Sequence, residues 1–312
     1  MSNKVTVVGA GFVGAACCQR IVEKDLADVI LVDVVEGLPQ GKALDIMESA
    51  PIEGFNSKVI GANDYSLTKN SDIVLITAGI ARKPGMSRDD LQATNAAIIS
   101  DVVKKASALS PDAVIIMVTN PLDVMSYLAL KVSGFSKERV IGMAGVLDSA
   151  RLRYFVSSLL SVSPQIVEAM VLGGHGDLMV PVSACTNVSG VAITQFISQD
   201  AIEAIIERTK KGGAEIVGLL KTSSAYYAPS SSAVQMVKSI LNDEGKIFPC
   251  SVYLNGEYGI TDAFCGVPVR LSRKGVEQVI EIKLTGQESA LLKKSSGAVK
   301  ENIKKLNLRN KS

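Results

Sequence analysis

The sequence contains no tryptophan, a single histidine and no long hydrophobic run. With only His175 and five scattered cysteines that form no C-x-x-C pair, it lacks the clustered ligands of a zinc, iron or copper site. The odd cysteine count also argues against a disulfide framework. The longest apolar stretches, such as residues 113–118, reach about a third of the length of a membrane span. We therefore expect no bound metal and no membrane-spanning segment.

An excess of charge of either sign is also missing. Lys plus Arg (33) nearly balance Asp plus Glu (31), whereas a nucleic-acid-binding domain is usually strongly basic. Hydrophobic residues make up 47% of the 312 residues, which excludes a disordered chain. Residues 1–4 lead directly into the apolar run 5–8, without the pattern of a secretory signal. We expect a cytoplasmic protein that binds neither nucleic acid nor membranes.

The order of apolar runs predicts the fold class. At about 150 residues per domain, the length favours two domains. Short β-branched runs alternate with helical patterns at first, as in a parallel sheet that is buried on both faces. We predict an α/β fold: a Rossmann-type doubly wound parallel sheet over residues 1–145, then a mixed α+β substrate domain over residues 146–312. The expected strands are 5–8, 29–32, 58–60, 73–77, 114–118, 140–141, 167–172, 247–254 and 267–271, and the expected helices are 13–24, 39–48, 89–109, 124–132, 149–160 and 287–306.

A glycine motif follows the first expected strand. Gly9-Ala10-Gly11-Phe12-Val13-Gly14 matches G-x-G-x-x-G between a strand and a helix, which is the context that dinucleotide binding requires. Gly9 would permit the tight turn, Gly11 the close approach of a pyrophosphate, and Gly14 the packing of the helix on the strand. The helix N-terminus would supply N–H donors and positive potential. All six residues are candidate cofactor-binding residues.

An acidic residue completes this pattern. Asp33 ends the second expected strand, 22 residues after Gly11. A carboxylate at this position can accept hydrogen bonds from the ribose hydroxyls and would repel a 2′-phosphate. The expected cofactor is therefore NAD rather than NADP. The alternative is a glycine-rich turn followed by an ordinary strand-terminal aspartate.

The segment Leu172–Asp177 places the sole histidine in a glycine-flanked turn. Any histidine that acts as a general acid or base must therefore be His175. Asp148 and Arg151, at spacing i, i+3, can share one face of a helix. Asp148 could orient an imidazole and Arg151 could clamp a carboxylate. The spacing alone, however, favours a simple intrahelical ion pair.

A loop with two arginines follows the expected strand at residues 73–77. Arg82 and Arg88 lie in a stretch with Pro84 and Gly85, at the carboxyl edge of the sheet where ligands bind. Such a loop could close over a site and exclude water. By composition alone it could equally be a solvated basic loop. Asn120 follows the strand at residues 114–118 and lies at the same edge.

Several motifs together resemble malate dehydrogenases, in particular the branch of that family related to lactate dehydrogenases. They occur in order from residue 9 to residue 177, and the chain length and later elements also fit. The resemblance implies that His175 exchanges the proton of the substrate hydroxyl or carbonyl and that Asp148 orients it. The motifs are the glycine motif, T-A-G-x-x-R-K-P-G-M-x-R, Thr119-Asn120-Pro121-Leu122-Asp123, the run from Gly145 to Arg151, and G-G-H-G-D.

The resemblance also implies roles for further residues. Arg151 would bind the carboxylate beside the reacting carbon, and Arg88 would polarise the carbonyl oxygen. Asn120 would contact substrate and nicotinamide. Further cofactor-binding residues would be Asn95, Val118 and Asp33.

Arg82 indicates which substrate is expected. Lactate dehydrogenases typically carry glutamine at the matching position, facing a methyl group. An arginine can instead pair with the second carboxylate of malate or oxaloacetate. Gly174 likewise agrees with the malate branch, because lactate dehydrogenases usually carry glutamate there.

We therefore expect reversible, NAD-dependent oxidation of (S)-malate to oxaloacetate, as in the tricarboxylic acid cycle. One alternative is a lactate or other 2-hydroxyacid dehydrogenase, which Arg82 disfavours. Another is a non-catalytic NAD(H)-binding redox sensor. The resemblance also implies a homo-oligomer, either a homotetramer or a homodimer.

Overall fold

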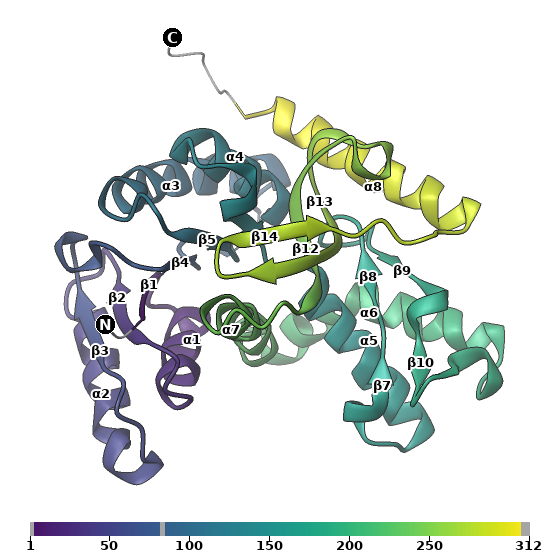
Figure 1. The fold of residues 1–312 in the computed structure, drawn as a ribbon, viewed down its shortest axis with the longest axis horizontal. Helices are drawn as coiled ribbons and strands as arrows, with labels where there is room; N and C mark the ends of the chain where they lie inside the picture. The colour runs from purple at the N-terminus through teal and green to yellow at the C-terminus, as the bar shows by residue number, and fades with distance from the viewer. Residues whose placement is uncertain (1–2, 82–84, 307–312) are drawn as a thin grey trace.

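The structure is a computed structural model that describes residues 3–81 and 85–306 (Figure 1). Arg82, which the sequence analysis connects with the substrate, lies outside the described residues. The chain forms a large sheet flanked by helices, with a smaller lobe of helices and short strands beside it. Both parts contribute to the candidate site.

Within the described residues, nine strands form the main sheet in the order β14-β13-β12-β6-β5-β4-β1-β2-β3. The strands from β3 to β6 pair in parallel in the order 3-2-1-4-5-6, which is the order of a Rossmann fold. This confirms the predicted fold class. The parallel strands are β1 (Lys4–Val8), β2 (Asp28–Val32), β3 (Val59–Ala62), β4 (Ile73–Ile76), β5 (Val114–Met117) and β6 (Val140–Gly142).

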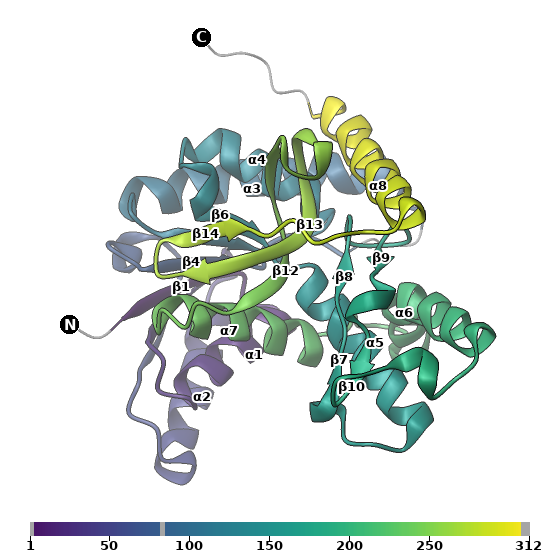
Figure 2. The same ribbon diagram turned by 45° about the vertical axis from the view of Figure 1, so that its right-hand side comes forward.

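Helices cover both faces of the parallel strands because these strands are apolar on both faces. Helices α3 and α4 lie over one face, and α1, α2 and α7 lie over the other (Figures 1 and 2). Two apolar cores result, one on each side of the sheet. The helices of this part are α1 (Phe12–Val22), α2 (Leu38–Glu53), α3 (Arg88–Leu109) and α4 (Leu122–Ser133), with the short 3₁₀ helices η1 (Ser66–Thr68) and η2 (Lys137–Arg139).

The second half of the chain extends the same sheet. An antiparallel hairpin of β12 (Ile247–Asn255) and β13 (Thr261–Ser272) joins β6 through Ser251 and Gly142, and β14 (Gly275–Val279) pairs with β13. The expected antiparallel patch is therefore present and continuous with the parallel strands. The helices here are α5 (Gly145–Leu160), α6 (Gln199–Leu220), α7 (Tyr227–Leu241) and α8 (Gly286–Lys304).

The lobe beside the sheet combines α5 and α6 with short strands around a separate apolar core (Figure 2). Its short strands are β7 (Val167–Glu168), β8 (Val171–Leu172), β9 (Val180–Pro181), β10 (Asn187–Val188) and β11 (Val191–Ala192). The remaining 3₁₀ helices are η3 (Pro164–Ile166), η4 (Ser183–Cys185), η5 (Ile193–Gln195) and η6 (Glu257–Gly259).

Two expected elements have different bounds. The single strand expected over residues 167–172 is two strands, because β7 pairs with β10 whereas β8 pairs with β9. Helix α2 continues through Pro51 to Glu53 instead of ending near residue 48. Pro51 removes only one N–H donor from the helix. The helix then ends at Gly54, which has a left-handed conformation and donates its N–H to the carbonyl of Ala50.

Candidate active site

The glycine motif lies at the carboxyl edge of the parallel strands. Gly9 follows β1 with φ of +105°, a conformation that favours glycine. A Cβ on Gly14 would lie 1.8 Å from the carbonyl oxygen of Gly9, so the close approach of α1 to this turn requires glycine. A Cβ on Gly11, in contrast, would meet no atom within 4 Å, because this residue faces open space at the start of α1.

Asp33 lies directly beside this turn. Its Oδ2 accepts a hydrogen bond of 2.6 Å from the N–H of Ala10, and its Oδ1 accepts one of 2.9 Å from Val35. These bonds hold the carboxylate against the glycine motif. The motif and the acid, which are separated in sequence, therefore form one continuous surface at the ends of β1 and β2.

A cavity of about 1000 Å³ opens along this surface. Gly9, Gly11 and Asp33 line it, together with Thr77 and Gly79 after β4. The cavity is mostly apolar with a few polar groups, which suits a nucleotide. The open space at Gly11 leaves room for a phosphate group beside the N-terminus of α1.

The other predicted cofactor residues of the glycine motif and of the segment after β5 do not line this cavity themselves. Ala10 is buried and Val13 packs on the core, whereas Phe12 is 62% exposed and stacks on Tyr226 with ring centroids 5.2 Å apart. Val118, the residue directly after β5, also packs against the core. Phe12 therefore contacts Tyr226 at the start of α7 and is not itself among the residues that line the cavity.

Asn95 connects two segments at the same edge. From α3, its buried amide accepts a hydrogen bond from the N–H of Ile80, donates to the carbonyl of Ile80, and donates to the carbonyl of Asn120 at 2.7 Å. The side chain of Asn120 is exposed. Asn95 thus holds the loop after β4 against the turn after β5.

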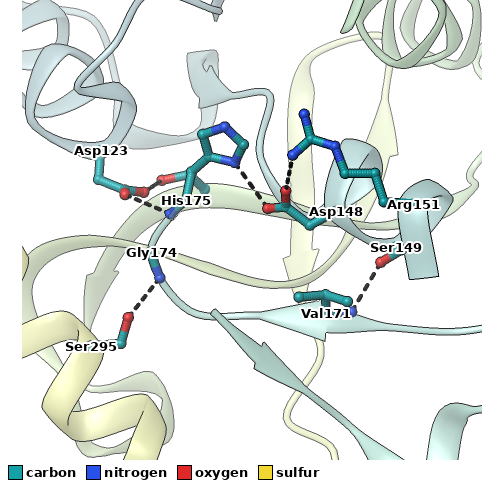
Figure 3. Close-up of polar contacts among 9 residues, drawn as sticks. Asp123, Asp148, Ser149, Arg151, Val171, Gly174, His175 and Ser295 are labelled. Carbon is teal, nitrogen blue, oxygen red and sulfur yellow. Dashed lines mark hydrogen bonds and ion pairs between the residues drawn. The ribbon is translucent and has the colours of Figure 1, made fainter. Parts of the chain in front are cut away.

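His175, Asp148 and Arg151 meet at the junction of the lobe and the sheet (Figure 3). The Nδ1 of His175 lies 2.9 Å from Oδ2 of Asp148, and Nη1 of Arg151 lies 3.4 Å from the other carboxylate oxygen. Asp148 and Arg151 share one face of α5, as their spacing predicts. The intrahelical ion pair is present, and the same carboxylate also holds the histidine ring. The exposed fractions of the side chains are 17% for His175, 2% for Asp148 and 13% for Arg151.

Charge and burial act in opposite directions at these groups. Burial by itself lowers the pKa of His175, but the charge and hydrogen bond of Asp148 outweigh this effect and raise the pKa above its ordinary value. Asp123 adds to the rise, and Arg151 opposes it. Burial lowers the pKa of Arg151, and the charge of Asp148 counteracts that shift. An imidazole of this kind can accept and return a proton near neutral pH.

Arg151 has a hydrogen-bond donor without a partner, and its side chain lies in a narrow space beside α6. Its Nε is buried and makes no hydrogen bond in the structure. A Cβ on Gly212 of α6 would lie 3.2 Å from Cδ of Arg151, so glycine in this helix makes room for the side chain. A buried guanidinium with a free donor is suited to bind an anionic ligand.

Arg88 reaches the same region from another element. It is the first residue of α3, whose N-terminus is closed by a capping box between Ser87 and Asp90. Its Nη2 lies 3.4 Å from Oδ2 of Asp177, two residues after His175. Both side chains are largely exposed, at 81% and 77%, so this ion pair is weak and readily exchanged for another partner.

Sequence reasoning missed three residues that shape the site. Asp123 and Ser295 hold the main chain of the His175 turn, and Gly212 makes room for Arg151. Gly212 could have been suspected, because glycine inside a long helix costs stability and needs a reason. Asp123 belongs to the Thr119–Asp123 motif, which by itself gives this residue no role, and Ser295 carries no comparable local signal.

In the ranges 3–81 and 85–306, no group of three or more His, Cys, Asp or Glu side chains is placed to hold a metal ion. No helix in the same part of the chain is long and apolar enough to cross a membrane.

A Rossmann sheet, a nucleotide-sized cavity beside a glycine motif, and a histidine paired with a buried Asp–Arg couple define a dinucleotide-binding α/β protein equipped for proton transfer. The chain belongs to the lactate/malate dehydrogenase family. Residues 3–142 match the NAD binding domain of this family, and residues 145–308 match its alpha/beta C-terminal domain.

Curated relatives resemble the chain over almost its whole length. A malate dehydrogenase of Chloroherpeton thalassium is 58% identical over 305 residues, which are 97% of this chain and 98% of the relative. A malate dehydrogenase of Roseiflexus castenholzii is 55% identical over 303 residues, with the same coverage of 97% and 98%.

Solved structures include both branches of the family. A malate dehydrogenase of Salinibacter ruber matches with a TM-score of 0.93 and 49% identity, covering 97% of each chain. A lactate dehydrogenase of Cryptosporidium parvum, complexed with lactic acid and nicotinamide adenine dinucleotide, matches with a TM-score of 0.94 and 40% identity, covering 97% of this chain and 98% of its own. The backbone fold alone therefore does not distinguish the two activities.

Proposed function

We propose that this protein catalyses the reversible, NAD-dependent oxidation of (S)-malate to oxaloacetate. The observation that carries the proposal is the contact of His175 with the buried Asp148–Arg151 pair. It places a proton acceptor beside a cation that can bind a carboxylate, which are the two groups that oxidation of a 2-hydroxy acid requires.

In this proposal each group has one task. His175 takes the hydroxyl proton during oxidation and returns it during reduction, while Asp148 holds the ring and stabilises its charged form. Arg151 binds the carboxylate next to the reacting carbon. Arg88 leaves Asp177 and polarises the carbonyl oxygen, where negative charge develops during reduction. Asn120 contacts the substrate from the turn after β5.

The cofactor would lie in the cavity along the glycine motif. Gly9, Gly11 and Asp33 line that cavity, and the open space at Gly11 fits a pyrophosphate. Asn95, Val118 and Asn120 would extend the site toward the nicotinamide, and Ala10, Phe12, Val13 and Gly14 would shape the turn. Bound NAD supplies the hydride acceptor.

Arg82 is the residue that we propose selects malate over lactate. It lies outside the described residues, so this proposal rests on sequence and chemistry. The guanidinium can pair with a second carboxylate, whereas a methyl group would leave the charge desolvated and without a partner. The relatives named malate dehydrogenase support this choice of substrate.

The deciding experiment is the loss of NADH absorbance with purified protein, comparing oxaloacetate with pyruvate at equal concentrations. We expect fast turnover of oxaloacetate and little turnover of pyruvate. Preference for pyruvate would overturn the substrate assignment and favour a lactate or other 2-hydroxyacid dehydrogenase. NADH binding without turnover of either substrate would favour a redox sensor.

The two directions of the reaction should depend on pH in opposite ways. The pKa of His175 is raised above its ordinary value of about 6.5, chiefly because Asp148 overcomes the effect of burial. Malate oxidation needs the neutral ring, so kcat/KM for malate should fall as pH drops through this raised pKa. Oxaloacetate reduction needs the charged ring and should fall as pH rises through it. Initial rates from pH 5 to 9 in both directions test this prediction. If both rates change in the same direction with pH, the prediction is wrong.

Asp33→Ala should weaken NADH binding by about tenfold or more, because hydrogen bonds to a charged group are lost. The affinity for NADPH relative to that for NADH should rise, because the carboxylate that repels the 2′-phosphate is gone. Titration of each cofactor by fluorescence measures both effects. Asp64→Ala is a matched control for the loss of one carboxylate from the cavity lining, because Asp64 lines the same cavity from a different loop. Unchanged NADH affinity in Asp33→Ala would refute the assignment.

The organisation of the protein is proposed by the same reasoning. Residues 1–145 would bind NAD and residues 146–312 would supply most of the substrate site. We propose a cytoplasmic homodimer or homotetramer acting in the tricarboxylic acid cycle. Sedimentation of the purified chain would establish its oligomeric state.

A further inference from the structure

The turn that carries His175 is held through its main chain by elements distant in sequence. Gly173 and Gly266 of β13 exchange two backbone hydrogen bonds, of 2.8 and 3.1 Å. The N–H of Gly174 donates to Oγ of Ser295 in α8 at 2.8 Å, and the N–H of His175 donates to Oδ2 of Asp123 in α4 at 3.1 Å (Figure 3). The Asp123 contact differs from the others because its acceptor is a carboxylate.

Asp123 has a buried and well-defined environment. It is only 6% exposed, and its Oδ1 accepts a hydrogen bond of 2.6 Å from the hydroxyl of Ser251, which is fully buried in β12. Both carboxylate oxygens are therefore acceptors, as fits the ionised form. The pKa of Asp123 lies above its ordinary value, because burial, with a further contribution from the charge of Asp148, outweighs the opposing effects of the hydrogen bonds from Ser251 and the His175 N–H and of the His175 charge.

A neutral acceptor would hold the turn at a lower desolvation cost. Ser295 shows this directly, since its hydroxyl binds the neighbouring N–H without a charge. Burying a carboxylate is costly unless its charge has a use. The positive end of α4 supports that charge, but the oxygens of Asp123 bind Ser251 and His175. The group that benefits from a negative charge here is the imidazolium form of His175.

We propose that Asp123 is a positioning residue for His175: it holds the turn through the His175 N–H and, with Asp148, supplies a second negative charge that favours the protonated ring. The inference rests on the proposed role of His175 as proton donor and acceptor. Asp148 acts on the ring directly, whereas Asp123 acts from the main-chain side of the turn.

Among the described residues, the charged groups that shift the pKa of His175 come from α5 and α4. From α5, Asp148 raises the pKa of His175 and Arg151 lowers it, and from α4, Asp123 raises it. The Cys265 thiol of β13 interacts electrostatically with Asp123, but burial raises the pKa of this thiol far above neutrality, so it adds no charge. Removal of the Asp123 charge should therefore favour the neutral ring.

Asp123→Asn tests the charge separately from the shape. The amide oxygen can accept the His175 N–H and the amide nitrogen can donate to Ser251, so both contacts are retained without the charge. Because the chain has a single histidine, ¹³C-histidine labelling gives one titrating ring signal in the full-length protein without a His-tag. We expect the midpoint to fall by roughly half a pH unit, less than in Asp148→Asn, where a direct ion pair is lost.

Ser295→Ala is the matched control. It removes a neutral acceptor from the neighbouring N–H and should leave the titration midpoint unchanged. A midpoint in folded Asp123→Asn equal to that of the unaltered protein would overturn the inference. If the midpoint falls but the pH dependence of kcat/KM does not follow, the electrostatic effect of Asp123 is supported and the proposed role of His175 fails.

A measurement on the unaltered protein tests the contact if Asp123→Asn does not fold. Labelling with ¹⁵N-histidine gives one backbone amide signal, that of His175. We expect slow exchange of this amide in D₂O, because it donates to a buried carboxylate. Exchange at the rate of an unprotected amide would show that the contact is absent and overturn the inference.

Discussion

Replacing His175 by asparagine is expected to lower kcat by about 10²–10⁴-fold in both directions, the range usual for loss of a general acid or base. The effect should be large because no other imidazole is present in the sequence to take over the proton. An asparagine amide can still donate to Asp148, so the buried carboxylate keeps a hydrogen-bond partner. Steady-state rates with malate and with oxaloacetate measure the loss.

The same variant should bind NADH as the unaltered protein does, because the ring contacts Asp148 and the cavity lining lies along the glycine motif. Unchanged NADH affinity and melting temperature would show that only the proton transfer is affected. A kcat within tenfold of the original value would mean that His175 does not transfer the proton in the rate-limiting step.

Arg82→Gln is expected to change the substrate preference by two or more orders of magnitude. The guanidinium is proposed to pair with the second carboxylate of oxaloacetate, and loss of one partner of a desolvated ion pair costs about 3–5 kcal/mol. Pyruvate carries a methyl group instead and should be accepted better once the charge is gone. The ratio of kcat/KM for oxaloacetate to that for pyruvate measures this change.

Two further substitutions, one at the next residue and one at Arg82 itself, serve as controls. Lys83→Gln removes the same charge from the next residue and should leave the ratio near its original value. Arg82→Lys keeps the charge but not the paired N–H donors, so an intermediate ratio is expected. If Arg82→Gln leaves the oxaloacetate kinetics unchanged, another residue selects the substrate.

Local patterns were sufficient to predict several parts of the candidate site. The spacing of Asp148 and Arg151 placed both on one helix face, where the ion pair is found. The alternation of strands and helices predicted the parallel sheet, and therefore the common edge at which Gly9 and Asp33 lie. These predictions succeed because helix period and strand burial are properties of short segments.

Contacts between distant segments were not predictable in the same way. Ser295 lies 121 residues from Gly174, and Ser251 lies 128 residues from Asp123. Their sequences read as an ordinary helix and an ordinary strand. The split of residues 167–172 into β7 and β8 has the same origin, because each strand pairs with a partner whose position only the folded chain defines.

Residue types and short-range spacing are sufficient to predict the fold class, the glycine motif with Asp33 and the single imidazole available for proton transfer. The joint contact of the Asp148 carboxylate with Arg151 and His175, and the burial of Asp123 against the His175 turn, arise from tertiary packing. They arise there because α4, α5, α8 and the β12–β13 hairpin converge on one turn. The charge and burial that set the pKa of His175 exist only after these elements have packed together.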